Sequence, residues 1–120
     1  MSANDFANEI DRLLHLYKPE ITYSQLNLLD SHDTPRFLSC ARGDQPSLKL
    51  AWLFMLTFPG APCIYYGDEI GVDGEHDPDC RKSFPWDESQ WDHSLLDYLK
   101  SAISLRKTHP SLRRGTFTRL

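Results

Sequence analysis

Apolar residues near the start of the chain recur at the spacing of an α-helix. They stand at positions i, i+4, i+7, i+8 and i+11, which share one helix face: Phe6, Ile10, Leu13, Leu14 and Tyr17. Ser2 or Asn4 can cap the start of this helix, and Pro19 is expected to close it. A similar pattern over residues 95–106 predicts a last amphipathic helix, which His109-Pro110 ends.

Between these two helices the sequence predicts two short apolar strands, each followed by polar residues. A buried strand over about residues 25–29 ends in Asp30-Ser31-His32-Asp33, and Pro35 prevents its extension. A second buried strand, over residues 63–66, is broken by Gly67 before two acids. Parallel strands that deliver acids at their carboxyl ends are typical of α/β barrels, which place catalytic groups there.

The remaining segments read as one further helix and one long loop. Residues 48–58 are apolar nearly all round, which predicts a helix that is covered on most sides. Pro46 suits the first turn of that helix. Residues 68–92 are rich in Asp, Pro and Gly, and a loop of this length is usually functional or disordered. Residues 115–120 look like the beginning of a strand.

Composition limits the size and the class of the protein. With 120 residues, 40% of them hydrophobic, the chain can form one domain, whereas a complete (β/α)8 barrel needs about 250. A net charge of −4 gives no support for nucleic-acid or anionic-membrane binding, and no apolar run approaches the roughly 18 residues of a membrane span. The N-terminus lacks the features of a secretory signal. Three cysteines without a close pair fit a reduced, cytoplasmic setting.

Two motifs resemble the α-amylase superfamily of glycoside hydrolases. Residues 27–33 (Asn-Leu-Leu-Asp-Ser-His-Asp) resemble its segment at the end of barrel strand seven. Residues 60–69 (Gly-Ala-Pro-Cys-Ile-Tyr-Tyr-Gly-Asp-Glu) resemble its segment at strand eight. Ser31 before the His-Asp pair, and Thr34-Pro35-Arg36 after it, are similar to the neopullulanase, cyclomaltodextrinase and maltogenic amylase branch.

This resemblance implies an α/β fold, namely a partial TIM (β/α)8 barrel from roughly helix six to helix eight with strands seven and eight. Residues 1–109 would form this C-terminal portion of the catalytic barrel. Residues 110–120 would start the connection to an absent C-terminal β-sandwich. Exposed barrel edges and the apolar helix predict a homo-oligomer, because both features seek partners.

The resemblance also implies roles for four residues. Asp33 corresponds to a catalytic carboxylate that stabilises the oxocarbenium-like transition state, and His32 to a histidine that hydrogen-bonds the same sugar. Asp77 and Arg81 resemble a pair that binds the next sugar, although a surface ion pair is an equal alternative. Trp86 has the type of face that stacks on sugars, but core packing is the favoured interpretation.

The acids of the long loop do not match a metal site. The EF-hand template fails because Pro78 and Phe84 stand where its glycine and its bidentate glutamate should be. His76 and Cys80 lack the second close ligand pair that a zinc site needs. We therefore predict no metal and no cofactor.

The predicted function is that of a piece of a hydrolase (a glycosidase) in carbohydrate metabolism. Retaining glycosidases need a nucleophile and an acid/base about 5–5.5 Å apart, and the family's motifs for both do not occur in this sequence. The intact enzyme would cleave α-1,4 bonds of cyclodextrins, pullulan or maltooligosaccharides, with α-1,6 bonds and transglycosylation left open. The isolated chain is predicted to be inactive. The alternatives are a non-catalytic glucan-binding or self-associating module and, less favoured, an unrelated α/β binding domain.

Overall fold

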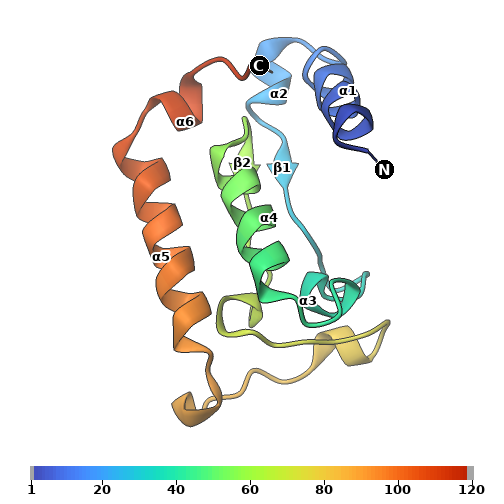
Figure 1. Cartoon of the computed structure of the whole chain (residues 1–120), viewed down its shortest axis with the longest axis vertical. Coiled ribbons are helices and arrows are strands. Elements are labelled where there is room, and N and C mark those ends of the chain that lie inside the picture. Colours follow the sequence, from blue (N-terminus) through green and yellow to red (C-terminus); the bar gives the residue numbers. More distant parts are fainter. Residues whose placement is uncertain (1, 119–120) are drawn as a thin grey trace.

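The chain is organised around two long helices that pack along each other. The structure, a computed structural model, describes residues 2–118. Helix α4 (Gln45–Thr57) lies beside α5 (His93–Thr108), and two short strands, β1 (Leu26–Asn27) and β2 (Ala61–Pro62), run next to them (Figure 1). The other α-helices are α1 (Ala3–Leu14), α2 (Pro19–Thr22), α3 (Phe37–Cys40) and α6 (Ser111–Arg114).

Helix α1 begins at the predicted cap and ends earlier than predicted. The backbone N–H of Asp5 donates to Ser2 Oγ at 3.2 Å, and the Ser2 N–H donates to the Asp5 carboxylate at 2.9 Å. This reciprocal pair satisfies two N–H groups that the first turn leaves free. The helix stops at Leu14, so Tyr17 lies outside it. Pro19 opens α2 instead of only closing α1, because its fixed φ suits a first helical turn.

The two strands are parallel and shorter than the sequence predicts. Leu26 pairs with Ala61 and Asn27 with Pro62, so the predicted second strand at residues 63–66 is wrong by two positions. Cys63 adds one more hydrogen bond, from its N–H to the Asn27 carbonyl at 2.7 Å, and the chain then leaves the sheet. The prediction that the first strand is buried is also wrong, because Leu26 is 62% exposed. Within residues 2–118 the sheet has two strands, and they leave most of the Leu26 side chain uncovered.

The hydrophobic core lies between α4 and α5. Seven buried residues form it: Leu48, Trp52, Met55, Leu56, Leu95, Leu99 and Ala102. Four of them come from α4, as its apolar sequence predicts, but Leu50 on the same helix is 68% exposed. Apart from Pro46 and Leu50, the residues of α4 are buried or half-buried, so the helix is covered on most sides, as predicted.

Arg106 of α5 joins the core helices to the chain around the strands. Its guanidinium donates to the carbonyl oxygens of Leu56 and Phe58 at 2.7 and 3.1 Å, and to that of Gly60 at 2.6 Å. A further bond reaches the carbonyl of Leu112 at 2.7 Å. The last carbonyls of a helix have no partner within the helix, so this side chain caps the end of α4.

The long loop after β2 contains short turns of 3₁₀-helix rather than long irregular chain. These turns are η1 (Asp68–Ile70), η2 (Asp79–Arg81) and η3 (Glu88–Gln90). Helix α5 follows and ends before His109-Pro110, as the sequence predicts. The predicted strand at residues 115–120 is not present over residues 115–118, and residues 119–120 lie outside the described part. No described helix combines the length and the apolarity needed to cross a membrane.

Candidate functional site

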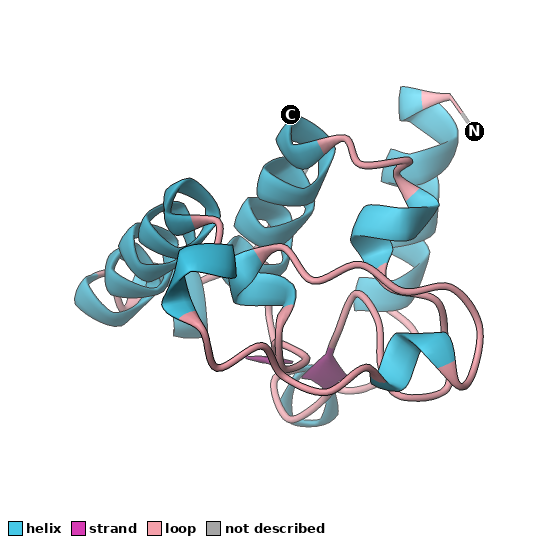
Figure 2. Cartoon of the chain, turned by 90° about the horizontal axis from the view of Figure 1, so that it is seen from below, coloured by secondary structure: helices cyan, strands magenta, loops and turns pink. Residues whose placement is uncertain are grey.

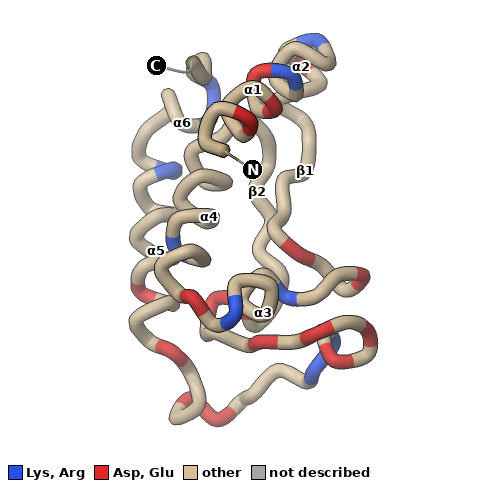
Figure 3. The backbone as a smooth tube through the Cα atoms, turned by 45° about the vertical axis from the view of Figure 1, so that its right-hand side comes forward, with Lys and Arg blue, Asp and Glu red and all other residues tan. Residues whose placement is uncertain are grey.

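The candidate site lies where two loops leave the strands. Residues 28–36 follow β1 and residues 63–82 follow β2, and both loops start at one edge because the strands are parallel. Seen from below, loops and helices surround the two short strands (Figure 2). Acidic residues recur along the loops at this end, with a few basic residues among them (Figure 3).

The four predicted site residues, His32, Asp33, Asp77 and Arg81, meet in one cluster, which we call the site quartet. Arg81 is at its centre: the Nε atom lies 2.8 Å from Asp77 Oδ1 and donates to the backbone carbonyl of His32 at 3.0 Å. Arg81 Nη2 lies 3.8 Å from Asp33 Oδ1, and Asp33 Oδ2 lies 3.3 Å from His32 Nε2. Two residues from each loop thus form a continuous polar surface.

The site quartet faces solvent. The side chains of His32 and Asp33 are 63% and 71% exposed, and those of Arg81 and Asp77 are 49% and 57% exposed. Exposed ion pairs contribute only about 0–1 kcal/mol to stability, so folding does not depend on the quartet. Carboxylates accept hydrogen bonds, whereas guanidinium and imidazole groups donate them. The cluster therefore offers both donors and acceptors to a polar ligand.

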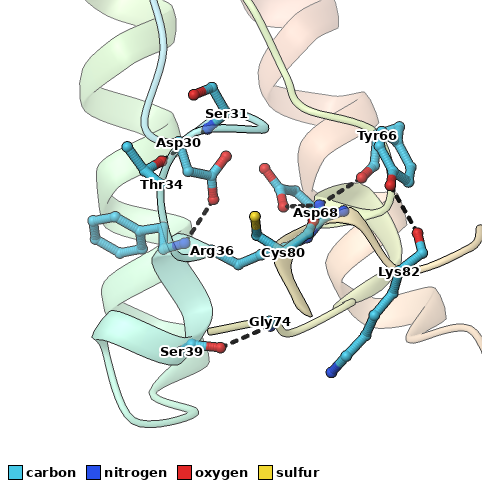
Figure 4. A network of polar contacts seen from close by, with 11 residues as sticks. Asp30, Ser31, Thr34, Arg36, Ser39, Tyr66, Asp68, Gly74, Cys80 and Lys82 are labelled. Carbon is cyan, nitrogen blue, oxygen red and sulfur yellow. Dashed lines mark hydrogen bonds and ion pairs between the residues drawn. The ribbon is translucent and has the colours of Figure 1, made fainter. Parts of the chain in front are cut away.

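A buried arginine lies beneath this surface. Arg36 is fully buried, and its Nη1 atom donates to Asp68 Oδ1 at 2.8 Å and to the Tyr66 carbonyl. Its Nε atom donates to the Cys80 carbonyl at 3.2 Å, and the guanidinium carbon lies 4.3 Å from the centre of the Tyr65 ring. Figure 4 shows Arg36 reaching from the first loop into the second. A buried charge is tolerated when it is paired and hydrogen-bonded in this way.

Two buried carboxyl groups share the region of Arg36. Asp30 and Asp68 are 4% and 5% exposed, and their carboxyl groups point toward each other (Figure 4). Burial, together with the neighbouring Asp30, raises the pKa of Asp68 from 3.8 to about 8, although Arg36 acts in the opposite direction. Asp30 Oδ2 accepts the Phe37 N–H at 2.6 Å, whereas Oδ1 has no hydrogen-bond partner among the described residues. A proton on Asp68 can satisfy that atom.

The sequence pattern does not identify this buried group. Arg36 stands in the Thr34-Pro35-Arg36 segment that marks the branch of the family, and Asp68 stands in the strand-eight motif of residues 60–69. An arginine directly after a proline, next to a predicted strand end, carries no signal of burial. Asp68 is also closed to a substrate, because its carboxyl group is buried and bound to Arg36. It does not supply a catalytic acid at the surface.

The structure also corrects the interpretation of Trp86. Core packing was favoured for this residue, but Trp86 is 84% exposed. Its ring centre lies 4.8 Å from that of Phe84, which in turn lies 5.7 Å from Trp91. Phe84 and Trp91 are half-buried, whereas the Trp86 ring lies mostly in solvent. Among the described residues, no group of three or more His, Cys, Asp or Glu side chains is placed to hold a metal ion.

Comparisons with known proteins agree with the two sequence motifs. Residues 1–115 match the family model for the alpha amylase catalytic domain. A cyclomaltodextrinase of Geobacillus thermopakistaniensis is 49% identical over 96% of this chain and 20% of its own length. Neopullulanase 2 of Thermoactinomyces vulgaris is 44% identical over 94% of this chain and 19% of its own length.

Solved structures show the same relationship. The native form of the debranching enzyme from Nostoc punctiforme superposes with a TM-score of 0.91 and is 46% identical. The match covers 97% of this chain and 24% of that one. The chain thus spans about a fifth of the length of the curated relatives that it matches. It corresponds to a part of a TIM-barrel catalytic domain, and it belongs to the alpha-amylase family of glycoside hydrolases.

Proposed function

We propose that this chain is the part of an α-glucan hydrolase that binds the sugar being cleaved and its neighbour. The observation that carries the proposal is the convergence of the site quartet on one exposed surface, because the four residues come from two separate loops. The surface lies at the carboxyl ends of parallel strands, where barrels of this type place their active sites. In barrel terms, we assign β1 and β2 to strands seven and eight and residues 1–109 to helix six through helix eight.

The proposed roles follow from the chemistry of each group. Asp33 would be a catalytic residue whose negative charge stabilises an oxocarbenium-like transition state. His32 would donate a hydrogen bond to a hydroxyl of the same sugar, and the Asp77–Arg81 pair would grip the next sugar. Arg81 contacts Asp77 in its own loop and His32 in the other loop, so a ligand at Arg81 would lie within reach of polar groups from both loops.

The isolated chain is proposed to bind glucan without hydrolysing it. Retaining hydrolysis needs a second and a third reactive group, a nucleophile and an acid/base about 5–5.5 Å apart. The family's motifs for these two groups do not occur in this sequence. In the whole enzyme, the substrates would be cyclodextrins, pullulan or maltooligosaccharides with α-1,4 bonds, and α-1,6 bonds belong to the same proposal.

The names of the relatives support this choice of substrates. Cyclomaltodextrinase, maltogenic alpha-amylase and neopullulanase occur among them, and a related structure holds maltose. One relative, from Bacillus subtilis, is called an intracellular maltogenic amylase, which supports a cytoplasmic location. The proposal needs no metal and no cofactor, and it does not include nucleic-acid or membrane binding.

A self-associating module is the second candidate function. The observation that favours it is the exposure of three leucines, 62% for Leu26, 45% for Leu28 and 68% for Leu50. Each strand also has one edge without a partner among the described residues, and such edges pair readily with another chain. A homo-oligomer through these surfaces is compatible with glucan binding at the site quartet.

Binding and turnover of maltotriose and β-cyclodextrin by the purified chain test the proposal. We expect weak binding, by titration calorimetry or chemical-shift changes, without hydrolysis. The variants Asp33→Asn and Arg81→Met should each weaken binding at least several-fold. Asp73→Asn is the matched control, because Asp73 is as exposed as Asp33, lies in the loop that carries Arg81, and pairs with Lys82 at 2.8 Å instead.

Two results would contradict the proposal. Binding that is unchanged in Asp33→Asn and Arg81→Met would show that the site quartet does not contact the sugar. Turnover that disappears in Asp33→Asn would show that a complete catalytic site forms from this chain alone.

A further inference from the structure

The site quartet is formed by two loops, and no strand pairing or helix connects these loops at the quartet itself among the described residues. His32 and Asp33 belong to the loop after β1, and Asp77 and Arg81 to the loop after β2. The strands pair only over Leu26–Asn27 and Ala61–Pro62, well before either loop reaches the site. Direct contact between the loops at the quartet is confined to exposed groups and to the His32 carbonyl, which accepts from Arg81 Nε at 3.0 Å and from Cys80 Sγ at 3.4 Å. Water competes for the exposed contacts, and the buried Cys80 Sγ is only a weak donor, so these contacts cannot fix the geometry alone.

Arg36 supplies a second connection that is closed to water. Its guanidinium donates to Asp68 Oδ1 at 2.8 Å, to the Tyr66 carbonyl and to the Cys80 carbonyl at 3.2 Å. The Arg36 backbone N–H donates to the Gly74 carbonyl at 2.8 Å. Four groups of the second loop, spread over residues 66–80, are therefore bound by one residue of the first loop. Figure 4 shows the Arg36 side chain against Tyr66 and Asp68, with Cys80 beside it.

The neighbours of Arg36 fix the first loop in turn. The Phe37 N–H donates to Asp30 Oδ2 at 2.6 Å, which closes the loop that carries His32 and Asp33. The Ser31 N–H donates to Thr34 Oγ1 at 3.0 Å inside that loop. Ser39 Oγ accepts the Gly74 N–H at 2.8 Å, next to the Arg36 backbone contact. The position of Arg36 thus sets the position of Asp33 three residues before it, and Cys80, which it binds, is followed directly by Arg81.

We infer that Arg36 is a positioning residue for glucan binding: it holds the two loops so that the exposed quartet has one geometry. The identity of the ligand as glucan rests on the proposed function, whereas the role of Arg36 in holding the two loops does not. An arginine is needed because Nε and Nη1 bind different groups, Cys80 on one side and Tyr66 and Asp68 on the other. A lysine keeps the charge and has a single nitrogen, so it cannot bind both sides.

The variant Arg36→Lys tests the inference in the full chain. In the wild-type protein, the Arg81 Hε proton should give nuclear Overhauser cross-peaks to the backbone of His32, as the 3.0 Å hydrogen bond requires. In Arg36→Lys we expect these cross-peaks to disappear, while those between α4 and α5 remain. Maltotriose affinity should fall at least tenfold. Arg12→Lys, an exposed arginine paired with Glu9 on α1, is the control and should change neither signal.

The two proposals fail in different ways. If Arg36→Lys folds and retains both the cross-peaks and the affinity, the inference is wrong and the proposed function stands. If the wild type binds no maltotriose, and the cross-peaks disappear in Arg36→Lys, the proposed function is wrong and the positioning role of Arg36 stands.

A measurement on the wild type decides the matter if Arg36→Lys does not fold. Hydrogen exchange of the Arg36 and Gly74 backbone N–H groups should then show one common opening, because Arg36 donates to the Gly74 carbonyl and Gly74 donates to Ser39 in the same contact between the loops. Exchange of the Arg36 N–H or the Gly74 N–H as fast as that of an exposed loop amide would overturn the inference.

Discussion

Asp30 and Asp68 turn their carboxyl groups toward each other in the interior, beside the guanidinium of Arg36 (Figure 4). Two carboxylates cannot both carry a charge there at low cost, because one guanidinium neutralises only one of them. The raised pKa of Asp68, about 8, follows from burial first and from Asp30 second. The folded chain therefore holds a proton that the unfolded chain releases.

This proton makes stability depend on pH. The pKa of Asp68 rises on folding, so its contribution to the free energy of unfolding is fully present below pH 3.8 and is lost as the pH rises to about 8. In Asp68→Asn, an uncharged amide replaces the protonated acid, and urea unfolding between pH 5 and pH 9 should show a much smaller decline. Asp77→Asn, on the exposed Asp77, should keep the wild-type slope. An unchanged slope in Asp68→Asn would show that Asp68 is ionised throughout.

Arg106 should be required for stability although it lies far from the site quartet. Arg106→Met leaves the carbonyls of Leu56, Phe58, Gly60 and Leu112 without this donor. A buried acceptor that loses its partner costs about 1–3 kcal/mol, so a loss of roughly 3 kcal/mol or more is expected by urea unfolding. Arg113→Met changes an exposed arginine nearby and should shift stability by less than about 0.5 kcal/mol. Equal effects of the two variants would contradict the capping role of Arg106.

The two sides of helix α4 should respond differently to truncation. Trp52 is 1% exposed and Leu50 is 68% exposed. Trp52→Ala removes a buried ring and should cost about 3–5 kcal/mol, enough to unfold a marginal domain. Leu50→Ala should cost less than about 0.5 kcal/mol in the free chain. Thermal unfolding followed by circular dichroism measures both, and a large loss in Leu50→Ala would mean that a partner already covers this side of the helix.

Exposed leucines along β1 and α4 should cause association in solution. Sedimentation velocity over a hundredfold range of concentration should show assemblies that dissociate on dilution, because apolar surface and open strand edges are buried between copies. Leu26→Glu places a charge on the exposed strand and should favour the monomer. Leu105→Glu, at a site that is 41% exposed on α5, is the control. A wild-type chain that stays monomeric at all concentrations would refute self-association.

Local sequence patterns determined the three long helices and the family, but not the short helices α2, α3 and α6. The apolar spacing that starts at Phe6, the cap at Ser2 and the His109-Pro110 terminator each act within a few residues, so the chain shows them without tertiary information. The motifs of residues 27–33 and 60–69 were sufficient for the family, since both are contiguous. The lengths of the strands were not predictable, because a strand ends where its neighbour stops pairing with it.

Only the tertiary structure decided how the site is held together. Asp33 and Arg81 are 48 positions apart, and their approach depends on the paired strands and on the buried contacts of Arg36. The exposure of Trp86 and the burial of Arg36 both run against the ordinary preferences of these residue types, so sequence composition favours the opposite assignments. Burial is a property of everything that packs around a side chain, and a pattern along the chain contains only the neighbours in sequence.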